Sequence, residues 1–295
     1  MASYSTPREA YDGILASYAR TEAGSGVTFD RSFGASGEVS RAVEAGLPAD
    51  VVGFSLEPDM TRLVEGGAVA EDWNEDEYRG MVTDSVVVIA VREGNPKDVE
   101  DWDDLTEPGV DVITPSPSTS GGAKWNFMAA YGAQRARGHS EEAALGYIGD
   151  LLENISVQDK SAREAMQTFI IGRGDAMLAY ENEVIQAQQL GYDLEYIVPE
   201  ETILIENPYA VVETSENPRE AEDFLEYLLS PEAQRIFGEK GYRPVVPEVR
   251  DEFGYREPPG LFTIEDYGGW ETVDEEFFGS EGSVTGVVEE RGTGG

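Results

Sequence analysis

Short runs of apolar residues that alternate with polar ones are followed, through most of the chain, by segments with helical periodicity. Residues 27–55 show one such unit: the run VTFDRSF, the loop GASG, an amphipathic segment that ends at Gly46, and a second apolar run to residue 55. The hydrophobic period changes from two residues to 3.6 and back, which is typical of a β-α-β unit.

The same alternation continues beyond this unit. Strands are predicted at residues 85–91, 110–114, 175–180, 196–199 and 210–213. Helices are predicted at residues 99–105, from Ser120 to Arg137 with Gly138 ending the helix, at 140–155 with Ser140 as its cap, within 155–170, and twice within 217–245. Alternating strands and helices predict the α/β class, with parallel or mixed sheets flanked by helices. A length of 295 residues favours two lobes.

The charge is strongly negative, with 59 acidic residues against 21 basic ones and a formal net charge of -38. The acidic residues occur in every segment, and only four residues are lysine. Such a chain is not expected to bind nucleic acid by neutralising phosphates. Mutual repulsion of this size weakens with added salt, because the Debye length falls to about 3 Å at 1 M. A halophilic source is therefore expected.

The sequence contains no cysteine, so disulfides, thiolate nucleophiles and cysteine-ligated metals are excluded. No run of 18 or more apolar residues occurs, and the start MASYSTPREAYDGIL lacks the basic-then-apolar pattern of a secretion signal. These residues alone predict a soluble chain without a targeting signal.

Motifs for catalysis, metal binding and nucleotide binding depart from their required patterns. GASGE differs from the nucleophile elbow G-x-S-x-G because Glu38 occupies the last position, and the single histidine, His139, lies in the polar link RGHSEE. Neither an EF-hand nor a phosphate-binding glycine loop has the required spacing, so no metal and no cofactor are predicted. A serine-type hydrolase that uses Ser36 or Ser120 as nucleophile is the alternative from another functional class.

Three predicted strand-to-helix junctions carry serine beside a small residue: Ser36-Gly37, Ser120-Gly121-Gly122 and Ser161-Ala162. A helix start offers unpaired backbone N–H groups and about half a positive charge, and small residues let an anion approach the backbone. Each junction taken singly also fits an ordinary N-cap serine. If the three converge, they form an anion site made of neutral donors.

The sequence closely resembles the sulfate-binding proteins of ABC importers, in the sulfate and thiosulfate branch of the periplasmic-type solute-binding proteins. The matching stretches are SYSTPRE (3–9), GASGEVSRAVEAGLPADVV (34–52), REGNPKDVEDWDDLTEPGVDVITPSPSTSGGAKWNF (92–127), AYENE (179–183), LSPEAQRIFGEKGYRPV (229–245) and LFTIEDYGGW (261–270). The resemblance implies a two-lobed type II clamshell without enzymatic activity. Lobe 1 is expected at 1–84 and 205–295, lobe 2 at 85–204, and the hinge crossings near 84–90 and 200–208.

The resemblance also implies which residues bind the anion. Carried over one by one, the ligand contacts fall on Ser36, on Ser120 with Gly121 and Gly122, on the backbone N–H of Ala162, and on Ser5 in the first loop. The family usually has tryptophan where this chain has Tyr180, whose hydroxyl can donate as well as accept. A turn shorter than the family's, GRGD (172–175), precedes that strand.

Tyrosine at the place of the family's tryptophan suggests molybdate or tungstate as an alternative to sulfate, because the binders of those anions also have tyrosine at the comparable place. Thiosulfate is a further alternative ligand. The expected ligand is sulfate or a similar tetrahedral oxyanion, and the expected partner is the membrane permease of an ABC importer. The resemblance implies an extracytoplasmic, membrane-anchored monomer, although no signal is visible before SYSTPRE.

Overall fold

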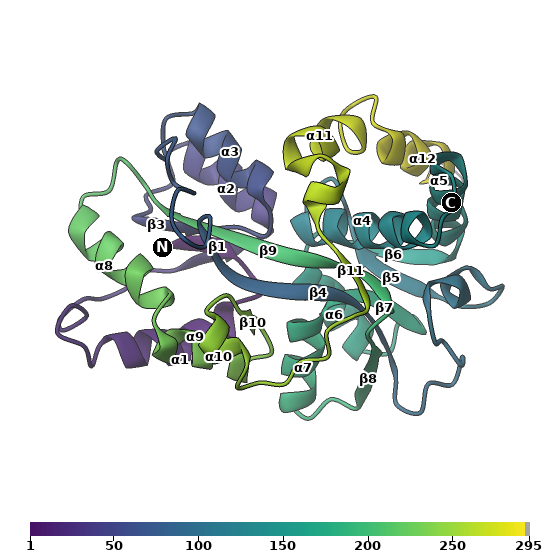
Figure 1. Cartoon of the computed structure of the whole chain (residues 1–295), viewed down its shortest axis with the longest axis horizontal. Coiled ribbons are helices and arrows are strands. Elements are labelled where there is room, and N and C mark those ends of the chain that lie inside the picture. Colours follow the sequence, from purple (N-terminus) through teal and green to yellow (C-terminus); the bar gives the residue numbers. More distant parts are fainter. Residues whose placement is uncertain (293–295) are drawn as a thin grey trace. The chain divides into compact units, whose positions relative to one another are not determined.

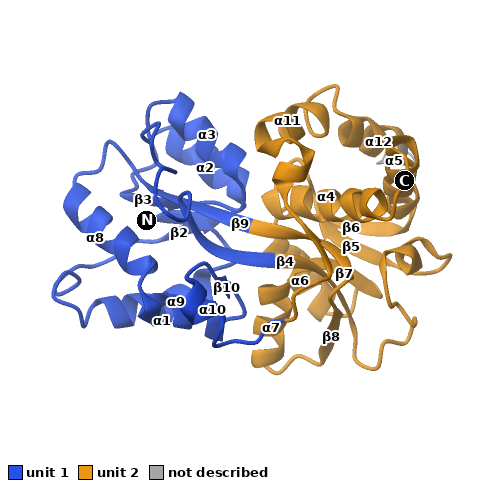
Figure 2. Ribbon diagram, in the orientation of Figure 1, with its two compact units in different colours: residues 1–85, 206–255 blue, residues 86–205, 256–295 orange. Residues whose placement is uncertain are grey.

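The computed structural model describes residues 1–292, which form two compact units. Unit 1 comprises residues 1–85 and 206–255, and unit 2 comprises residues 86–205 and 256–292 (Figure 2). The chain therefore passes from one unit to the other three times. Strand β4 (Met81–Arg92) and strand β9 (Glu201–Val211) carry the first two passages, and both contribute residues to each unit.

Unit 1 is built on a mixed sheet in the order β2-β1-β3-β9. Its short strands are β1 (Ala2–Tyr4), β2 (Ser32–Gly34), β3 (Val51–Gly53) and β10 (Arg243–Pro244). Its helices are α1 (Arg8–Tyr18), α2 (Ser36–Glu44), α3 (Glu57–Glu65), α8 (Pro218–Leu228), α9 (Pro231–Glu239) and α10 (Pro247–Arg250). Strand β1 pairs in parallel with β2 and β3, β3 pairs antiparallel with β9, and β10 pairs antiparallel with β4.

The predicted strand at residues 27–33 is too long. Strand β2 begins only at Ser32, and the preceding residues form a loop. The apolar alternation in this loop serves packing against helices, because the Phe29 ring lies 4.6 Å from that of Phe224 in α8 and 6.1 Å from that of Tyr18 in α1. Alternation alone does not distinguish a strand from an extended loop that packs on helices.

Unit 2 contains a second mixed sheet, in which β5 (Val112–Pro115) pairs in parallel with β6 (Ile155–Asp159) and β7 (Ala176–Tyr180). Strand β4 is antiparallel to β7 on one edge and to β8 (Leu194–Ile197) on the other, and β11 (Gly260–Phe262) pairs in parallel with β9. The α/β class with mixed sheets flanked by helices is therefore confirmed.

The helices of unit 2 are six α-helices and two 3₁₀ helices within the described residues. They are η1 (Trp102–Thr106), α4 (Gly121–Ala136), α5 (Glu141–Asn154), α6 (Ala162–Ile170), α7 (Glu181–Gln189), η2 (Ile264–Tyr267), α11 (Gly269–Glu276) and α12 (Ser283–Gly292). Helices α4 and α5 lie on one side of the β6-β5-β7 strands, and α6 and α7 lie on the other (Figure 1). The predicted Ser140 cap is confirmed, because its side chain accepts from the Ala143 N–H.

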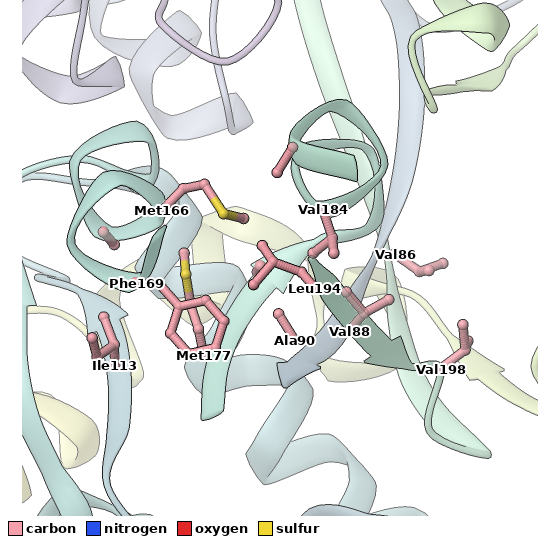
Figure 3. Packing of buried hydrophobic residues seen from close by; sticks show 13 residues of the cluster. Val86, Val88, Ala90, Ile113, Met166, Phe169, Met177, Val184, Leu194 and Val198 are labelled. Atoms are coloured by element: carbon pink, nitrogen blue, oxygen red, sulfur yellow. The ribbon is translucent and has the colours of Figure 1, made fainter. Parts of the chain in front are cut away.

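The core between the sheet of unit 2 and helices α6 and α7 consists of aliphatic, methionine and phenylalanine side chains (Figure 3). Met166 and Phe169 of α6 and Val184 of α7 pack there with Val88 of β4 and Met177 of β7. This packing holds α6 and α7 against β4 and β7. The start of α6 and the end of β7 are part of the candidate site described below.

The C-terminal segment differs from the predicted lobe assignment. The sequence placed residues 205–295 in lobe 1, whereas residues 256–292 group with unit 2; residues 293–295 lie outside the described residues. The reason is aromatic packing on α4: the rings of Trp270 and Trp125 lie 4.6 Å apart edge to face, and Asp274 forms an ion pair with Lys124. Apolar burial of this kind depends on which surfaces meet, and the linear pattern does not contain that information.

A buried carboxyl group lies just before the first passage between units. Asp84 of β4 is 9% exposed and faces Arg243 of β10 in the antiparallel register. The pKa of Asp84 is raised to about 8, mainly by burial and also by the nearby Glu206 carboxylate, while the arginines 250, 243 and 79 oppose the shift. Desolvation of the carboxylate therefore outweighs the attraction of the arginines.

This pKa predicts a pH-dependent stability. Between the usual value of 3.8 and about 8, the folded protein keeps a proton on Asp84 that the unfolded chain releases. The free energy of unfolding therefore falls as pH rises through that window, and one pKa unit corresponds to about 1.4 kcal/mol. Asp84→Asn should remove this pH dependence. The free energy of unfolding of the variant, relative to that of the parent protein, should therefore be higher at pH 8 than at pH 5.

Denaturant unfolding at both pH values and constant high salt measures the effect. Asp72→Asn, an exposed position in the same unit, is the matched control. An unchanged slope in Asp84→Asn would show that the carboxyl is ionised throughout this range.

Candidate functional site

Three of the residues singled out in the sequence lie at neighbouring strand ends of unit 2. Ser120 follows β5, Ala162 follows β6, and Tyr180 is the last residue of β7. Because β6, β5 and β7 are adjacent and parallel, their carboxyl ends meet at one edge of the sheet. In open α/β sheets this edge is where ligands bind.

These residues surround one point. A β-carbon added at Gly122 would lie 3.4 Å from the β-carbon of Ala162, 3.4 Å from Oγ of Ser120 and 3.5 Å from Cε1 of Tyr180. The space above the backbone at Gly122 is therefore in reach of all three residues, and any larger side chain there would fill it. The structure brings the predicted residues Ser120, Gly121, Gly122, Ala162 and Tyr180 together within unit 2.

The first turn of α4 has no side-chain cap. Ser120 occupies the N-cap position, but its hydroxyl makes no capping hydrogen bond, and the turn contains no acidic residue. By contrast, the N-cap hydroxyls of Ser140, Ser161 and Ser230 each accept from a backbone N–H three residues later, at 3.2–3.3 Å. The Ser120 hydroxyl and the first N–H groups of α4 can therefore serve an external acceptor.

Helix α6 contributes a second set of N–H groups beside the first. The Ser161 hydroxyl caps the Glu164 N–H, so the Ala162 N–H, at the first helical position, keeps no partner in its own helix. Ala162 offers only a backbone donor, and its small side chain leaves room for a ligand next to Gly122. The resemblance assigned Ala162 this same backbone donor.

Hydrogen bonds fix the loops that carry these helix starts. The Thr119 hydroxyl donates to the Lys160 carbonyl at 2.8 Å, and the Ser116 N–H donates to the Asp159 carbonyl at 2.7 Å. The Asn126 amide donates to Thr114 Oγ1 and to the Leu178 carbonyl, each at 3.0 Å, which ties α4 to β5 and β7. The donors at the starts of α4 and α6 are thus held before any ligand arrives.

The GRGD turn before β7 is held by Arg92. Its guanidinium donates to the carbonyls of Phe169, Arg173 and Gly174, and lies 3.8 Å from the centre of the Phe169 ring. Arg92 thereby satisfies carbonyl groups at the C-terminal end of α6. The short turn is consequently rigid, and it fixes the start of the strand that ends at Tyr180.

Unit 1 presents the same arrangement at its own sheet. Ser5 follows β1, Ser36 follows β2 and Ser55 follows β3, and these three strands are parallel neighbours. Helix α2 begins at Ser36 with Ala35 as its N-cap residue, and no side chain caps its first turn. The predicted residues Ser5 and Ser36 therefore lie at one sheet edge of unit 1.

The hydroxyl of Ser36 is already used within unit 1. Its Oγ donates to the carboxylate of Asp59 at 2.5 Å and accepts from the Ser55 N–H at 2.9 Å. A hydroxyl has a single proton to donate. Ser36 can therefore offer an anion its backbone N–H, while its side chain fixes the start of α2 against α3.

The sequence reasoning missed Asp59 and the network around it. The other Asp59 oxygen accepts from Arg62 at 3.2 Å, and the Ser55 carbonyl accepts from the Asn207 amide at 3.0 Å. All these side chains except that of Arg62 are buried. Asp59 and Ser55 lie 23 and 19 positions from Ser36, so no local motif signals them.

The chain matches a known family over most of its length. Residues 1–243 match the family model described as bacterial extracellular solute-binding protein. The chain belongs to the bacterial extracellular solute-binding proteins.

Individual members of this family are similar over nearly the whole chain. A sulfate-binding protein of Synechococcus elongatus is 40% identical over 293 residues, which cover 96% of this chain and 84% of the relative. A sulfate-binding protein of Escherichia coli is 37% identical, with 95% and 90% covered. The solved sulfate-binding protein SubI from Mycobacterium tuberculosis is 41% identical, with a TM-score of 0.92 and coverage of 94% and 98%.

The single histidine lies at the opposite end of α4 from Ser120. His139 is exposed just beyond the C-terminal end of α4, whose 16 residues span about 24 Å from the helix start at Ser120. A Ser120–His139 pair would need the two in hydrogen-bond contact. No three His, Asp or Glu side chains group as metal ligands within residues 1–292.

Within the same residues, no helix combines the length and apolar character needed to cross a bilayer.

The two serines at helix starts should differ in their effect on stability. Ser36→Ala leaves a buried carboxylate oxygen and a buried N–H without their partner, which costs about 1–3 kcal/mol. Ser120→Ala breaks no capping bond and should avoid the loss of about 1 kcal/mol that is usual for N-cap serines. Denaturant unfolding of both variants without ligand tests this ordering, and equal losses would contradict it.

Proposed function

We propose that this protein is an extracytoplasmic solute-binding protein that captures sulfate and delivers it to the membrane permease of an ABC importer. The observation that carries the proposal is the uncapped start of α4, where Ser120, Gly121 and Gly122 lie beside Ala162 and Tyr180. The relatives that cover nearly the whole chain are named sulfate-binding proteins. On this proposal the protein binds and releases its ligand and performs no catalysis.

Each unit by itself offers neutral donors as proposed ligand contacts. Unit 2 supplies the Ser120 hydroxyl, the N–H groups of Gly121, Gly122 and Ala162, and the Tyr180 hydroxyl. Unit 1 supplies the backbone N–H groups of Ser36 and Ser5. Helix N-termini suit this role because their N–H groups and dipoles favour negative charge. Buried dipoles also hold an oxyanion at high salt, where exposed ion pairs are screened.

Donor-only binding implies selectivity against hydrogen phosphate. Sulfate carries no proton at neutral pH, whereas hydrogen phosphate has a hydroxyl that needs an acceptor. The proposed contacts are hydroxyls and backbone N–H groups and include no carboxylate; that of Asp59 accepts hydrogen bonds from Ser36 and Arg62 within unit 1. A phosphate hydroxyl left without an acceptor costs binding free energy.

The remaining proposals follow from the family. The protein acts outside the cytoplasm, attached to the membrane in its full-length form, as a monomer that contacts a permease. The two units serve as its lobes, and β4 and β9 carry the hinge. It does not bind nucleic acid, because a net charge of -38 repels phosphates.

Calorimetric titration in high salt tests the ligand. Sulfate should bind, and phosphate should compete at least tenfold more weakly, which corresponds to about 1.4 kcal/mol.

Ser120→Ala should weaken sulfate binding by roughly 10- to 100-fold, since a hydrogen bond to a charged group contributes about 1.5–3 kcal/mol. Ser118→Ala, exposed on the same loop, is the control. Equal competition by phosphate would overturn the proposal.

Tyr180 favours a second candidate ligand, a larger dianion such as molybdate or tungstate. Its side chain is 1% exposed and its ring lies next to the Gly122 position, so its size sets the room at the site. If the hydroxyl donates to sulfate, Tyr180→Phe lowers sulfate affinity about tenfold.

Tyr180→Trp keeps a donor at this position, as an indole N–H, and should shift the preference from molybdate towards sulfate. Competition titrations of the two anions measure both effects, and stronger binding of molybdate than sulfate would favour this second candidate.

A further inference from the structure

One lysine stands directly beside the two helix starts of unit 2. Lys160 ends the loop from β6 and immediately precedes Ser161, the N-cap of α6. Its carbonyl accepts the Thr119 hydroxyl at 2.8 Å, so its backbone also lies against the residue before Ser120. The side chain is exposed. Lys160 therefore borders the proposed site from the solvent side.

The charge of Lys160 is not neutralised by an ion pair with any residue in the range 1–292. Two of the other three lysines are paired: Lys97 with Asp175 at 3.4 Å, and Lys124 with Asp274. The neighbouring charged side chains in the sequence are Asp159, Arg163 and Glu164. Without Lys160, these three neighbouring side chains would carry a net charge of -1.

The net charge of the chain makes such a position important. A dianion that approaches a protein with a formal charge of -38 is repelled over the Debye length, about 10 Å at 0.1 M salt. The bound state is held by neutral donors, so its lifetime depends little on exposed charge. A positive charge at the approach instead raises the local anion concentration and the association rate.

We infer that Lys160 is an association-controlling residue, which steers the dianion to the helix starts of α4 and α6 without forming part of the buried contact. This inference rests on the proposed function. It predicts a change in the association rate constant that salt removes, and little change in the dissociation rate constant.

Stopped-flow measurement of sulfate binding by tryptophan fluorescence tests the inference. At about 0.1 M salt, Lys160→Gln should lower the association rate about threefold and Lys160→Glu about tenfold, with dissociation nearly unchanged. At about 1 M salt and above, where screening acts within about 3 Å, all variants should associate at the same rate.

Lys97→Gln is the matched control. It makes the same charge change in the same unit, beside Asp175 at the amino end of β7, whereas Tyr180 ends that strand. Sucrose keeps the protein folded at low salt without screening charge, and circular dichroism verifies the fold of each variant.

The outcomes separate the two proposals. Absence of sulfate binding in the parent protein at every salt concentration would overturn the proposed function. Normal binding with equal association rates in Lys160→Gln and Lys97→Gln would overturn the role of Lys160 alone. A change confined to dissociation would also overturn it, because it would make Lys160 a direct contact.

Discussion

Backbone N–H groups at helix starts, left without partners in their own helices, are the interaction on which this structure depends. Parallel strands bring the starts of α4 and α6 to one edge of the sheet in unit 2, and a corresponding edge in unit 1 carries Ser5 and Ser36. The small residues at Gly121, Gly122 and Ala162 keep the backbone accessible. Among the helices whose N-cap residue is serine, α5, α6 and α9 are capped by that hydroxyl and α4 is not.

Serine has three different roles at three similar junctions. Ser161 caps its own helix, the Ser36 hydroxyl binds the Asp59 carboxylate, and the Ser120 hydroxyl makes no capping bond. The distinction follows from what lies opposite each hydroxyl. The Ser36 hydroxyl donates to a carboxylate 23 residues away, so only the backbone N–H of Ser36 is left for a ligand. No such acceptor meets Ser120 among the described residues, so its proton remains available to the proposed ligand.

The negative surface and the proposed neutral site are both compatible with high salt. In salt, the surface carboxylates are screened, while buried dipoles lose little of their effect. The ion pairs observed in each unit tie elements together, as Arg137 does with Asp101, Asp103 and Glu201 in unit 2. A site that relied on exposed lysines would lose affinity as salt is added, whereas the donors of the proposed site are backbone N–H groups and hydroxyls.

The sequence by itself determined the α/β class, the helix caps and the small residues at strand-to-helix junctions, because turn chemistry and hydrophobic periodicity are local properties. Through the family resemblance it also assigned Ser120, Gly122, Ala162 and Tyr180 to one ligand site. Only the tertiary structure decided how these four lie around the Gly122 position, that Asp59 takes the Ser36 hydroxyl, and that α11 packs on α4. Contacts between distant segments depend on shape complementarity and burial, which a linear pattern does not encode.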